Sequence, residues 1–448
     1  MGNYILPILL AAVGTYFLIK LRFFFIIHPH KTVARGFRAI KDKRALRSFF
    51  LALAGTLGVG NVLGVAIGII IGGAGSLFWL LVSMVFAMVI KYSEVVISSD
   101  NLFHDTDTHG GFFYVIKQSF RRIGGLLSGV YALAVLALSC VLGAALQTDA
   151  VSESLSEIGS VSSFGLALIL TVLVLFSIVG GTHKIEKVTS IIIPLTTIIY
   201  IIMTLSIIAV NFGSIGASIK HIVSSAFTFE SALGGGVGFL LSAPIKEGFS
   251  RGILSNEAGA GTSSMAHARS GVLSPATAGI LGILEVWFDT GLICTLTGLS
   301  ILLSVPDPTA FESGMELIMF TVGNLFGIGG KYAMLFCVFS FAYATVICWY
   351  YYGLESWSAL FGKKKRALFL PLFLIFVFLG CFSDSYTLVL ATDLLMAIAT
   401  ILTLSALIKN SDRIKHLSES GGVIDSDKGR IRPFRIKGNV FSKGERHR

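Results

Sequence analysis

Charged residues are scarce in this chain. Asp, Glu, Lys and Arg make up 13% of its 448 residues, about half the share of about 25% that soluble globular proteins carry. Hydrophobic residues account for 54%, which excludes a soluble multi-domain enzyme and indicates a polytopic membrane protein. The apolar runs are continuous and much longer than the roughly 10-residue alternating segments of membrane β-barrels. The fold class is therefore predicted to be an all-α membrane protein.

The sequence also has little that suggests a metal site, an enzyme or a nucleic-acid binder. The five cysteines fall inside apolar runs without a CxxC spacing, so neither a disulfide framework nor a zinc site is predicted. Residues 104–109 hold two histidines and two aspartates, but they lie in a loop without a supporting scaffold. The net charge is +10, but the charged residues are confined to short loops and one tail. Nucleic acid is therefore not an expected partner.

Eleven apolar runs are candidates for membrane spans, each of which needs about 20 mainly apolar residues. They cover residues 4–19, 46–72, 76–98, 124–148, 162–181, 188–211, 232–254, 275–304, 330–354, 367–383 and 386–408.

Lysine and arginine fall mainly on one side of this arrangement. That side holds segment 28–47, Lys246, Arg251, cluster 363–366 and tail 409–448. Because basic loops stay in the cytoplasm, we predict an N-terminus outside the cell and a cytoplasmic tail, with membrane lipid as the partner of the spans. The tail mixes charges with Gly and Ser and is expected to be disordered.

Two predicted spans are interrupted. Span 46–72 contains Gly-Thr-Leu-Gly-Val-Gly-Asn at residues 55–61, and span 232–254 contains four glycines at residues 234–238 and then Pro244. Glycine lets a helix unwind, and proline removes a backbone donor. After the first span, ten spans remain, and each interrupted helix is the first of a set of five. Because five is an odd number, the second set enters the membrane from the opposite side. We predict an extra helix at 1–27, inverted repeats at 28–211 and 212–408, and a tail at 409–448.

Interrupted helices at matching places in two halves point to a midplane binding site in a secondary transporter. The N–H groups at half-helix ends attract an anion such as a carboxylate, and unwound carbonyls hold a cation. The architecture thus predicts an anionic or zwitterionic substrate that is coupled to a cation.

Several short motifs occur in the order that they have in one known family. Residues 55–65 look like its first-helix signature, and residues 251–268 look like its most specific motif, with further matches at 91–94, 110–114, 288–297 and 349–353. On these residues the chain resembles the sodium:alanine symporter family, the alanine or glycine:cation symporters, from residue 4 to about 408. The resemblance implies a leucine-transporter-like fold with an extra N-terminal helix. It also implies sodium-coupled uptake of alanine or glycine across the bacterial inner membrane.

The resemblance also assigns a substrate site. The substrate carboxylate would sit on backbone N–H groups near Gly58, Val59 and Gly60, with Asn61 nearby. Carbonyls between Gly234 and Gly238 would receive the substrate ammonium.

Two further side chains are substrate candidates. Gln147 matches a glutamine of the family's third core helix that is implicated in substrate binding, and an interhelical hydrogen bond is its structural alternative. Trp349 matches a tryptophan at the pocket that would limit side-chain size, and a place in the interfacial aromatic belt is its alternative.

The resemblance places a sodium ion near Gly55, Thr56 and Thr345. Val59 stands where the family usually has Thr, and Ala344 stands where it usually has Ser. Each replacement deletes an oxygen, and a methyl group cannot coordinate a hard cation. These departures keep open a proton-coupled or different-substrate carrier of the same fold, and a sensor that has lost transport.

Four more polar residues are assigned to gates or proton transfer. Glu285 and Asp289 are four residues apart on one span and share a helix face, and intramembrane carboxylates are functional candidates by default. They would relay protons or hold a closed gate through hydrogen bonds. Asn256 and Glu257 are expected just past the cytoplasmic end of the second broken helix, as gate and cap elements. The predicted function is sodium-coupled symport of a small neutral amino acid, with no cofactor beyond the coupling ion.

Overall fold

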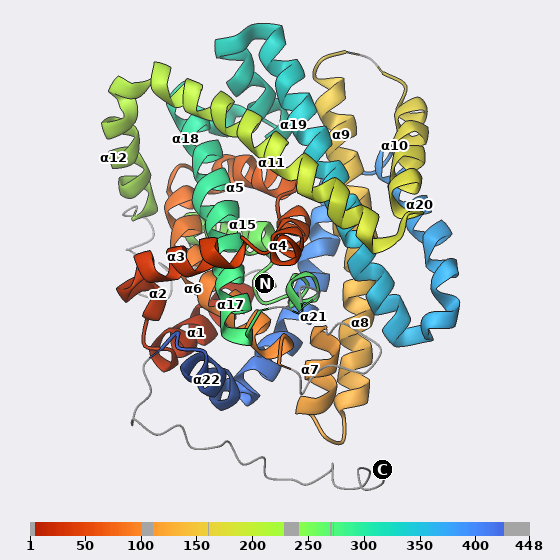
Figure 1. Ribbon diagram of the computed structural model, residues 1–448. Helices are drawn as coiled ribbons and strands as arrows, with labels where there is room; N and C mark the ends of the chain where they lie inside the picture. The colour runs from red at the N-terminus through yellow and green to blue at the C-terminus, as the bar shows by residue number, and fades with distance from the viewer. Residues whose placement is uncertain are drawn as a thin grey trace, which may run out of the picture.

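The computed structural model describes residues 5–100, 111–159, 161–227, 242–268, 271 and 273–424. All regular secondary structure in this part of the chain is helical (Figure 1). The main helices are α1 (Ile5–Lys20), α4 (Lys43–Thr56), α5 (Leu63–Gly72), α6 (Gly75–Ser98), α8 (Gly124–Cys140), α9 (Leu146–Ser156), α10 (Ser163–Ile178), α11 (Gly181–Val210), α15 (Ala243–Asn256), α17 (Pro275–Val286), α18 (Thr295–Ser304), α19 (Gly314–Phe361), α20 (Phe369–Gly380) and α21 (Ser385–Lys409).

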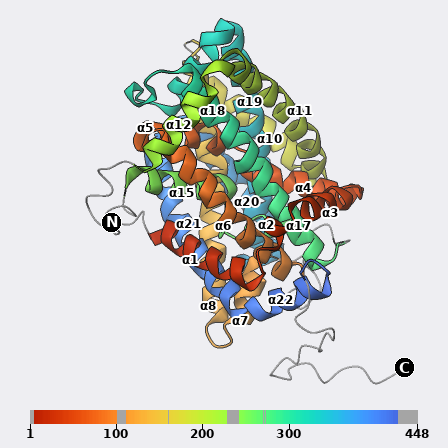
Figure 2. The same ribbon diagram turned by 90° about the vertical axis from the view of Figure 1, so that its left-hand side faces the viewer.

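Shorter helices complete the described chain. They are α2 (Phe24–Ile27), α3 (Pro29–Ala39), α7 (Phe112–Ser119), α12 (Ile215–Ala226), α16 (Ser264–Ala268) and α22 (Ser411–Ser420). Two π-helical turns, η4 (Val141–Ala145) and η6 (Trp287–Cys294), join α8 to α9 and α17 to α18. In both views α7 and α22 lie at the lower end of the molecule, and α12 lies toward the upper end (Figures 1 and 2).

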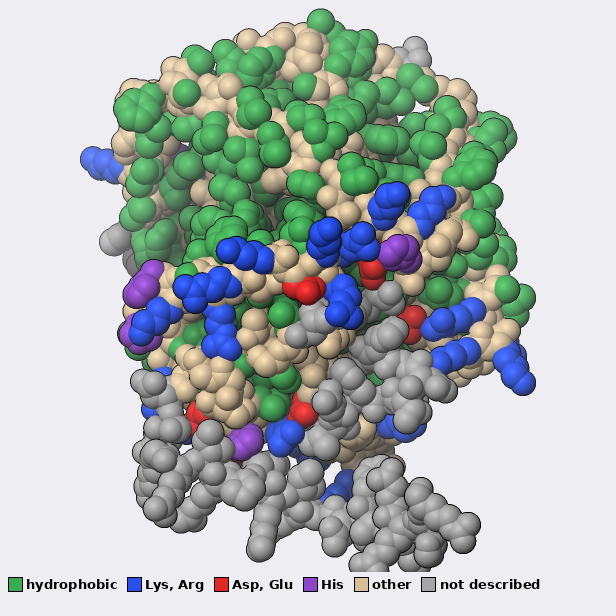
Figure 3. Space-filling view, in the orientation of Figure 1, with side chains coloured by type: hydrophobic (Ala, Val, Ile, Leu, Met, Phe, Trp, Pro, Cys, Tyr) green, Lys and Arg blue, Asp and Glu red, His purple; other side chains and the backbone are tan. Residues whose placement is uncertain are grey.

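The hydropathy of these helices suits a membrane. Among the described residues, six helices are long and apolar enough to cross a bilayer, and the bent pair α4–α5 adds a seventh candidate. Helices α1 and α10 are apolar but shorter. Hydrophobic side chains dominate the upper part of one face, while Lys and Arg gather in a band across its middle and lower part (Figure 3). The polytopic helical class predicted from the sequence is confirmed.

Helix α6 is the element against which α15 and α17 pack. A Cβ added at Gly248 of α15 would lie 2.5 Å from the carbonyl oxygen of Ser76, and one at Gly279 of α17 would lie 2.5 Å from Val96. Small residues at such positions let membrane helices approach closely. The close approach positions α15 and α17 around the site described below.

The second predicted interruption lies partly outside the described residues, because Gly234 and Gly238 fall there. Pro244 does not break a helix, because it occupies the first turn of α15, where proline needs no intrahelical partner for its nitrogen. Within the described residues the interruption comes later, at residues 257–263, between α15 and α16.

The backbone of this later interruption leaves the helical region at three places. Gly259 and Gly261 have φ angles of 95° and 73°, which glycine adopts readily. Glu257 has a φ of 53°, which is uncommon for a residue with a Cβ. Asn256 is therefore the last residue of α15, and Glu257 follows it directly, within the break.

The beginning of the tail is helical, whereas disorder is expected from residue 409. Arg413 of α22 forms an ion pair with Asp100, at 2.7 Å between Nε and Oδ2. The hydroxyl of Tyr92 on α6 donates a hydrogen bond to Ser418 Oγ at 2.8 Å. These contacts attach α22 to the end of α6, while residues 425–448 lie outside the described chain.

We expect Gly248→Ala to lower the thermal unfolding midpoint in detergent, because its methyl group would meet the α6 backbone. Overpacking of this kind costs about 1–3 kcal/mol. Gly129→Ala on α8 is the matched control, because no atom lies within 4 Å of its added Cβ and alanine favours a helix. Equal midpoints for the two variants would contradict the close contact between α15 and α6.

Candidate functional site

The first interruption separates α4 from α5, whose axes are bent by 61°. Between them lies the single 3₁₀ turn η2 (Val59–Asn61). The N–H of Gly58 donates to the carbonyl of Thr56 at 2.8 Å. The remaining backbone groups need other partners, because water is absent from the core of a bilayer.

Gln147 of α9 supplies one of these partners. Its Oε1 accepts a hydrogen bond from the N–H of Val59 at 3.2 Å. Its Nε2 donates to the carbonyl of Leu142 at 3.1 Å, within the π-helical turn η4. A Cβ at Gly58 would lie 2.9 Å from Gln147 Oε1. The structure thus brings together Gly58, Val59 and Gln147, which the sequence assigned to one site.

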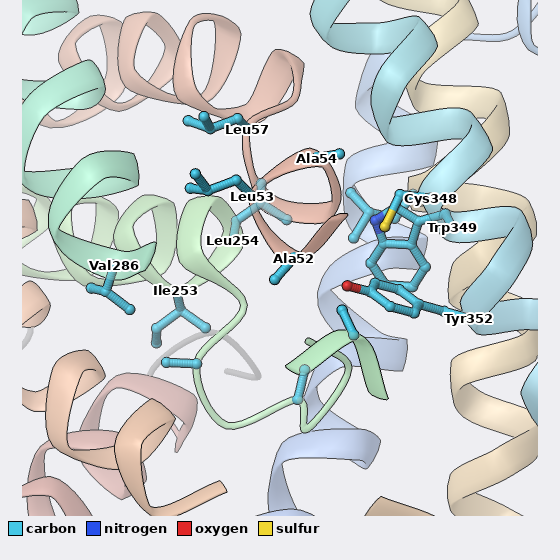
Figure 4. Close-up of a cluster of buried hydrophobic side chains, with 14 of the residues drawn as sticks. Ala52, Leu53, Ala54, Leu57, Ile253, Leu254, Val286, Cys348, Trp349 and Tyr352 are labelled. Carbon is cyan, nitrogen blue, oxygen red and sulfur yellow. The ribbon is translucent and has the colours of Figure 1, made fainter. Parts of the chain in front are cut away.

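Two side chains of α19 supply further partners. Thr345 Oγ1 donates to the carbonyl of Leu57 at 3.4 Å, and Trp349 Nε1 donates to the carbonyl of Gly55 at 3.2 Å. Trp349 is fully buried, and with Tyr352 it points from α19 toward α4 (Figure 4). Its ring lies in the protein interior rather than in an exposed aromatic belt.

The predicted ion-binding residues lie around the same break. Gly55 contributes a carbonyl that Trp349 already uses, and Thr56 donates its hydroxyl back to Leu53 at 3.4 Å. Ala344, which replaces the usual serine, is fully buried and brings only a methyl group. On α19, the hydroxyl of Thr345 is therefore the side-chain oxygen that remains from the predicted sodium ligands.

Asn61 connects the first interruption to α15 and to η6. Its Oδ1 accepts from the N–H of Gly58 at 3.2 Å. Its Nδ2 donates to Ser255 Oγ at 2.9 Å and to Asp289 Oδ1 at 2.5 Å. A Cβ at Gly60 would lie 3.9 Å from the Cα of Ser255. The middle of the first broken helix therefore abuts the end of α15.

Asp289 is the centre of this polar group. Its Oδ2 accepts from Ser255 Oγ at 2.6 Å and from Thr290 Oγ1 at 2.9 Å. Asn256 Nδ2 donates to Thr290 Oγ1 at 3.1 Å, so the predicted gate residues Asn256 and Asp289 are linked through a hydroxyl. Ser255 and Thr290 were not among the site residues predicted from the sequence. Ser255 lies in motif 251–268 and Thr290 lies in motif 288–297. The presence of these hydroxyls within family motifs could have identified both residues.

A second polar group lies beside the later interruption. Lys91 Nζ lies 3.3 Å from Glu285 Oε1 and donates to Ser263 Oγ at 2.8 Å. Glu285 Oε2 lies 2.7 Å from His267 Nε2. All these side chains are buried. Glu285 therefore binds Lys91 and the segment around α16, and Asp289 binds the first interruption, although the two carboxylates are close in sequence.

The loop of the later interruption is held by two more carboxylates. The i, i+3 spacing predicts an ion pair of Glu94 with Lys91, but Glu94 Oε1 instead accepts from the N–H groups of Gly259 at 2.7 Å and Gly261 at 3.2 Å. Glu257 Oε2 accepts from Thr262 Oγ1 at 2.7 Å. Glu257 thus stabilises its own loop.

A cavity of about 510 Å³ opens beside α5, α15 and α21. Lys246 and Arg251 line it together with Glu153 and Glu312. Both cations contact Glu247, at 3.3 Å and 3.0 Å.

Asp384 also lines this cavity, at the start of α21. Hydrogen bonds from the backbone N–H and the hydroxyl of Thr387 hold the pKa of Asp384 below its usual value. The mouth of the cavity therefore keeps an ionised carboxylate.

The sequence of the chain is similar to those of known transport proteins. Residues 1–418 match the sodium:alanine symporter family. The sodium/alanine symporter AgcS of Methanococcus maripaludis is 31% identical over 399 residues, which cover 85% of each chain. The amino-acid carrier protein AlsT of Bacillus subtilis is 30% identical over 77% of this chain and 73% of its own. The probable sodium/glutamine symporter GlnT of the same organism is 27% identical over 90% and 84%.

A solved structure has the same fold. A Na⁺-coupled sialic acid symporter in a substrate-bound outward-open state aligns with a TM-score of 0.50 and 11% identity, over 92% of this chain and 86% of its own. The chain accordingly has the leucine-transporter-like fold that the sequence predicts.

Removing one member of the buried Lys91 group should destabilise the protein. We expect Glu285→Gln to lower the unfolding midpoint, because loss of one partner of a buried ion pair typically costs about 3–5 kcal/mol. The double variant Lys91→Met with Glu285→Gln should recover part of the loss, since it buries no unpaired ammonium. Glu312→Gln, at an exposed glutamate, is the control in the same thermal assay. A double variant no more stable than Glu285→Gln would contradict the ion pair.

Proposed function

The chain belongs to the sodium:alanine symporter family, whose members are secondary transporters rather than enzymes, and we propose that it carries alanine or glycine into the cell together with sodium. Transport would proceed by alternating access around the first interruption. The comparisons leave the amino acid open, because one relative is described for alanine and another for glutamine.

The hydrogen bond between Val59 and Gln147 carries this proposal. The N–H of Val59 lies at an interrupted helix end and is satisfied by a side-chain amide rather than by the helix itself. Such an N–H is available to an anionic acceptor whenever the amide moves aside, and helix ends favour anions. The carboxylate of an amino acid is an acceptor of this kind. Gly58, Gly60 and Asn61 would complete the surroundings of the substrate main chain.

The packing of Trp349 supports a small substrate. A Cβ at Gly143 of η4 would lie 2.2 Å from the Cβ of Trp349, so the indole is pressed against the π-helical turn beside Gln147. The Tyr352 ring packs edge-on against it at 5.5 Å between centroids. Bulky rings on this side of the break would restrict the substrate to a side chain the size of hydrogen or methyl.

We propose a bacterial plasma membrane location, with the N-terminus outside and the tail in the cytoplasm. Lys363, of the predicted cytoplasmic cluster 363–366, lines the same cavity as Lys117 of α7, so these basic residues share one end of the fold. Basic residues grouped at one end favour the cytoplasmic side.

Uptake of labelled alanine, glycine and glutamine into proteoliposomes tests the proposed function. We expect accumulation of alanine or glycine under an inward sodium gradient and none under an inward proton gradient alone. Accumulation driven only by protons would overturn sodium coupling. Accumulation of glutamine with neither small amino acid would overturn the substrate assignment, and no accumulation at all would overturn transport of these substrates.

Gln147→Leu tests the site itself. We expect sodium-dependent alanine binding to weaken by at least about tenfold, equivalent to 1.4 kcal/mol, because the amide that moves aside would hydrogen-bond the bound substrate and leucine cannot. Gln118→Leu on the exposed face of α7 is the matched control for the same chemical change. Isothermal titration calorimetry on folded protein measures both, and unchanged affinity in Gln147→Leu would contradict the site.

A further inference from the structure

A cavity away from both interruptions has a basic wall. It has a volume of about 330 Å³ and lies between α2, α3, α17 and the residues that follow α22. Its charged lining residues are Arg22, Lys31 and Arg35, and His28 adds a hydrogen-bonding ring. No Asp or Glu of the described chain lines it. The cavity therefore attracts an anion.

Arg35 is held at this wall by neutral partners. Its Nε and Nη2 donate to Thr277 Oγ1 of α17 at 3.2 Å and 2.9 Å. Its guanidinium also donates to the carbonyls of Gly421 at 2.6 Å and Gly422 at 3.1 Å, just after α22. These bonds orient the guanidinium without compensating its positive charge. An oriented guanidinium is well suited to a phosphate group.

The turn between α1 and α2 brings a second arginine to the cavity. Arg22 and Phe23 have φ angles of 59° and 51°, a region that residues with a Cβ seldom adopt. Glycine would adopt this backbone more easily. Strain of this kind is concentrated at sites that bind ligands, and here it accompanies a side chain that lines the cavity, Arg22.

Exposed apolar side chains border the cavity. Ile27 lines it and is 60% exposed, and Ile26 beside it is 47% exposed. Val33 and Phe37 form a second exposed apolar pair, on α3. Over α2 and α3, basic side chains gather at the lower border of a hydrophobic surface (Figure 3). Charge beside exposed apolar surface is typical of segments that lie at a membrane interface.

Helix α3 also has the orientation of an interfacial helix. In both views it lies crosswise to α17 (Figures 1 and 2), which begins an apolar span. A Cβ at Gly36 would lie 2.3 Å from Leu284 Cδ1, so one face of α3 packs closely against α17. Residues 40–42 join α3 to α4. A ligand bound to α3 therefore lies near the start of the first interrupted helix.

A phospholipid matches both parts of this surface. Its phosphate suits the basic wall and its acyl chains suit the exposed apolar residues, whereas a free phosphate ion would use the wall alone. Basic pockets at the cytoplasmic ends of spanning helices bind head groups of this kind. We propose that the cavity binds the phosphate of an anionic phospholipid, whose acyl chains lie against Ile26 and Ile27. The site is independent of the substrate and the ion that the protein carries.

The test is native mass spectrometry of the full-length, delipidated protein, titrated with phosphatidylglycerol and phosphatidylcholine of identical acyl chains. We expect the wild type to bind its first phosphatidylglycerol more tightly than its first phosphatidylcholine. In the double variant His28→Gln with Lys31→Gln, affinity for phosphatidylglycerol should fall by at least about fivefold, because one lysine charge near a membrane surface contributes about this factor.

The double variant His30→Gln with Lys41→Gln is the matched control. It removes the same residue types from the same segment, at exposed positions that do not line the cavity. We expect this variant to bind phosphatidylglycerol as the wild type does. Because all four substituted side chains are exposed, both double variants should be monodisperse on size exclusion.

Four outcomes would overturn the lipid site. Equal affinity of the wild type for the two lipids would mean a general apolar contact. Wild-type affinity for phosphatidylglycerol in the His28 and Lys31 variant would place the lipid elsewhere, and an equal loss in the control variant would mean that overall charge sets the affinity. Inorganic phosphate that displaces phosphatidylglycerol at equal concentration would make the cavity a site for free anions.

Discussion

A backbone that leaves the helix inside a bilayer must find hydrogen-bond partners within the protein, and this requirement organises the molecule. At the first interruption the partners come from separate elements. Gln147 of α9 accepts from Val59, while Thr345 and Trp349 of α19 donate to the carbonyls of Leu57 and Gly55. Each such bond attaches another helix to the break. Because an unsatisfied group in hydrocarbon costs several kcal/mol, the placement of α9 and α19 around the first interruption follows from where α4 unwinds.

The two interruptions meet this requirement with different chemistry. Around the first, the partners of the unwound backbone are neutral amides, hydroxyls and an indole. Around the second, the buried carboxylate of Glu94 holds two backbone N–H groups, and Lys91, Glu285 and His267 lie beside it. Neutral hydrogen bonds exchange more easily than charged ones. The first interruption is therefore suited to exchange partners with a ligand, and the second is suited to act as a fixed support.

Much of the fold follows from hydropathy and glycine placement, and part of the site does not. Long apolar runs predict the helices, and the glycines between residues 55 and 61 predict the first interruption. Composition did not point to the interruption at residues 257–263, where only Gly259 and Gly261 are glycine and a glutamate adopts positive φ. The i, i+3 spacing predicts that Lys91 pairs with Glu94. The partner of Lys91 is instead Glu285 of α17, which is distant in sequence. Such pairings depend on how α6, α16 and α17 pack, which one sequence does not specify.

The amide of Gln147 also sets how tightly a carboxylate can be held. A carboxylate that takes the N–H of Val59 replaces one acceptor with another, so the number of hydrogen bonds at that N–H stays constant. The net gain is only the difference between a charged and a neutral bond, about 1 kcal/mol, rather than the full value of a new bond. A substrate that is bound by such an exchange of acceptors dissociates readily, because the Gln147 amide takes the N–H of Val59 again. The exchange therefore favours rapid release of the substrate over tight binding.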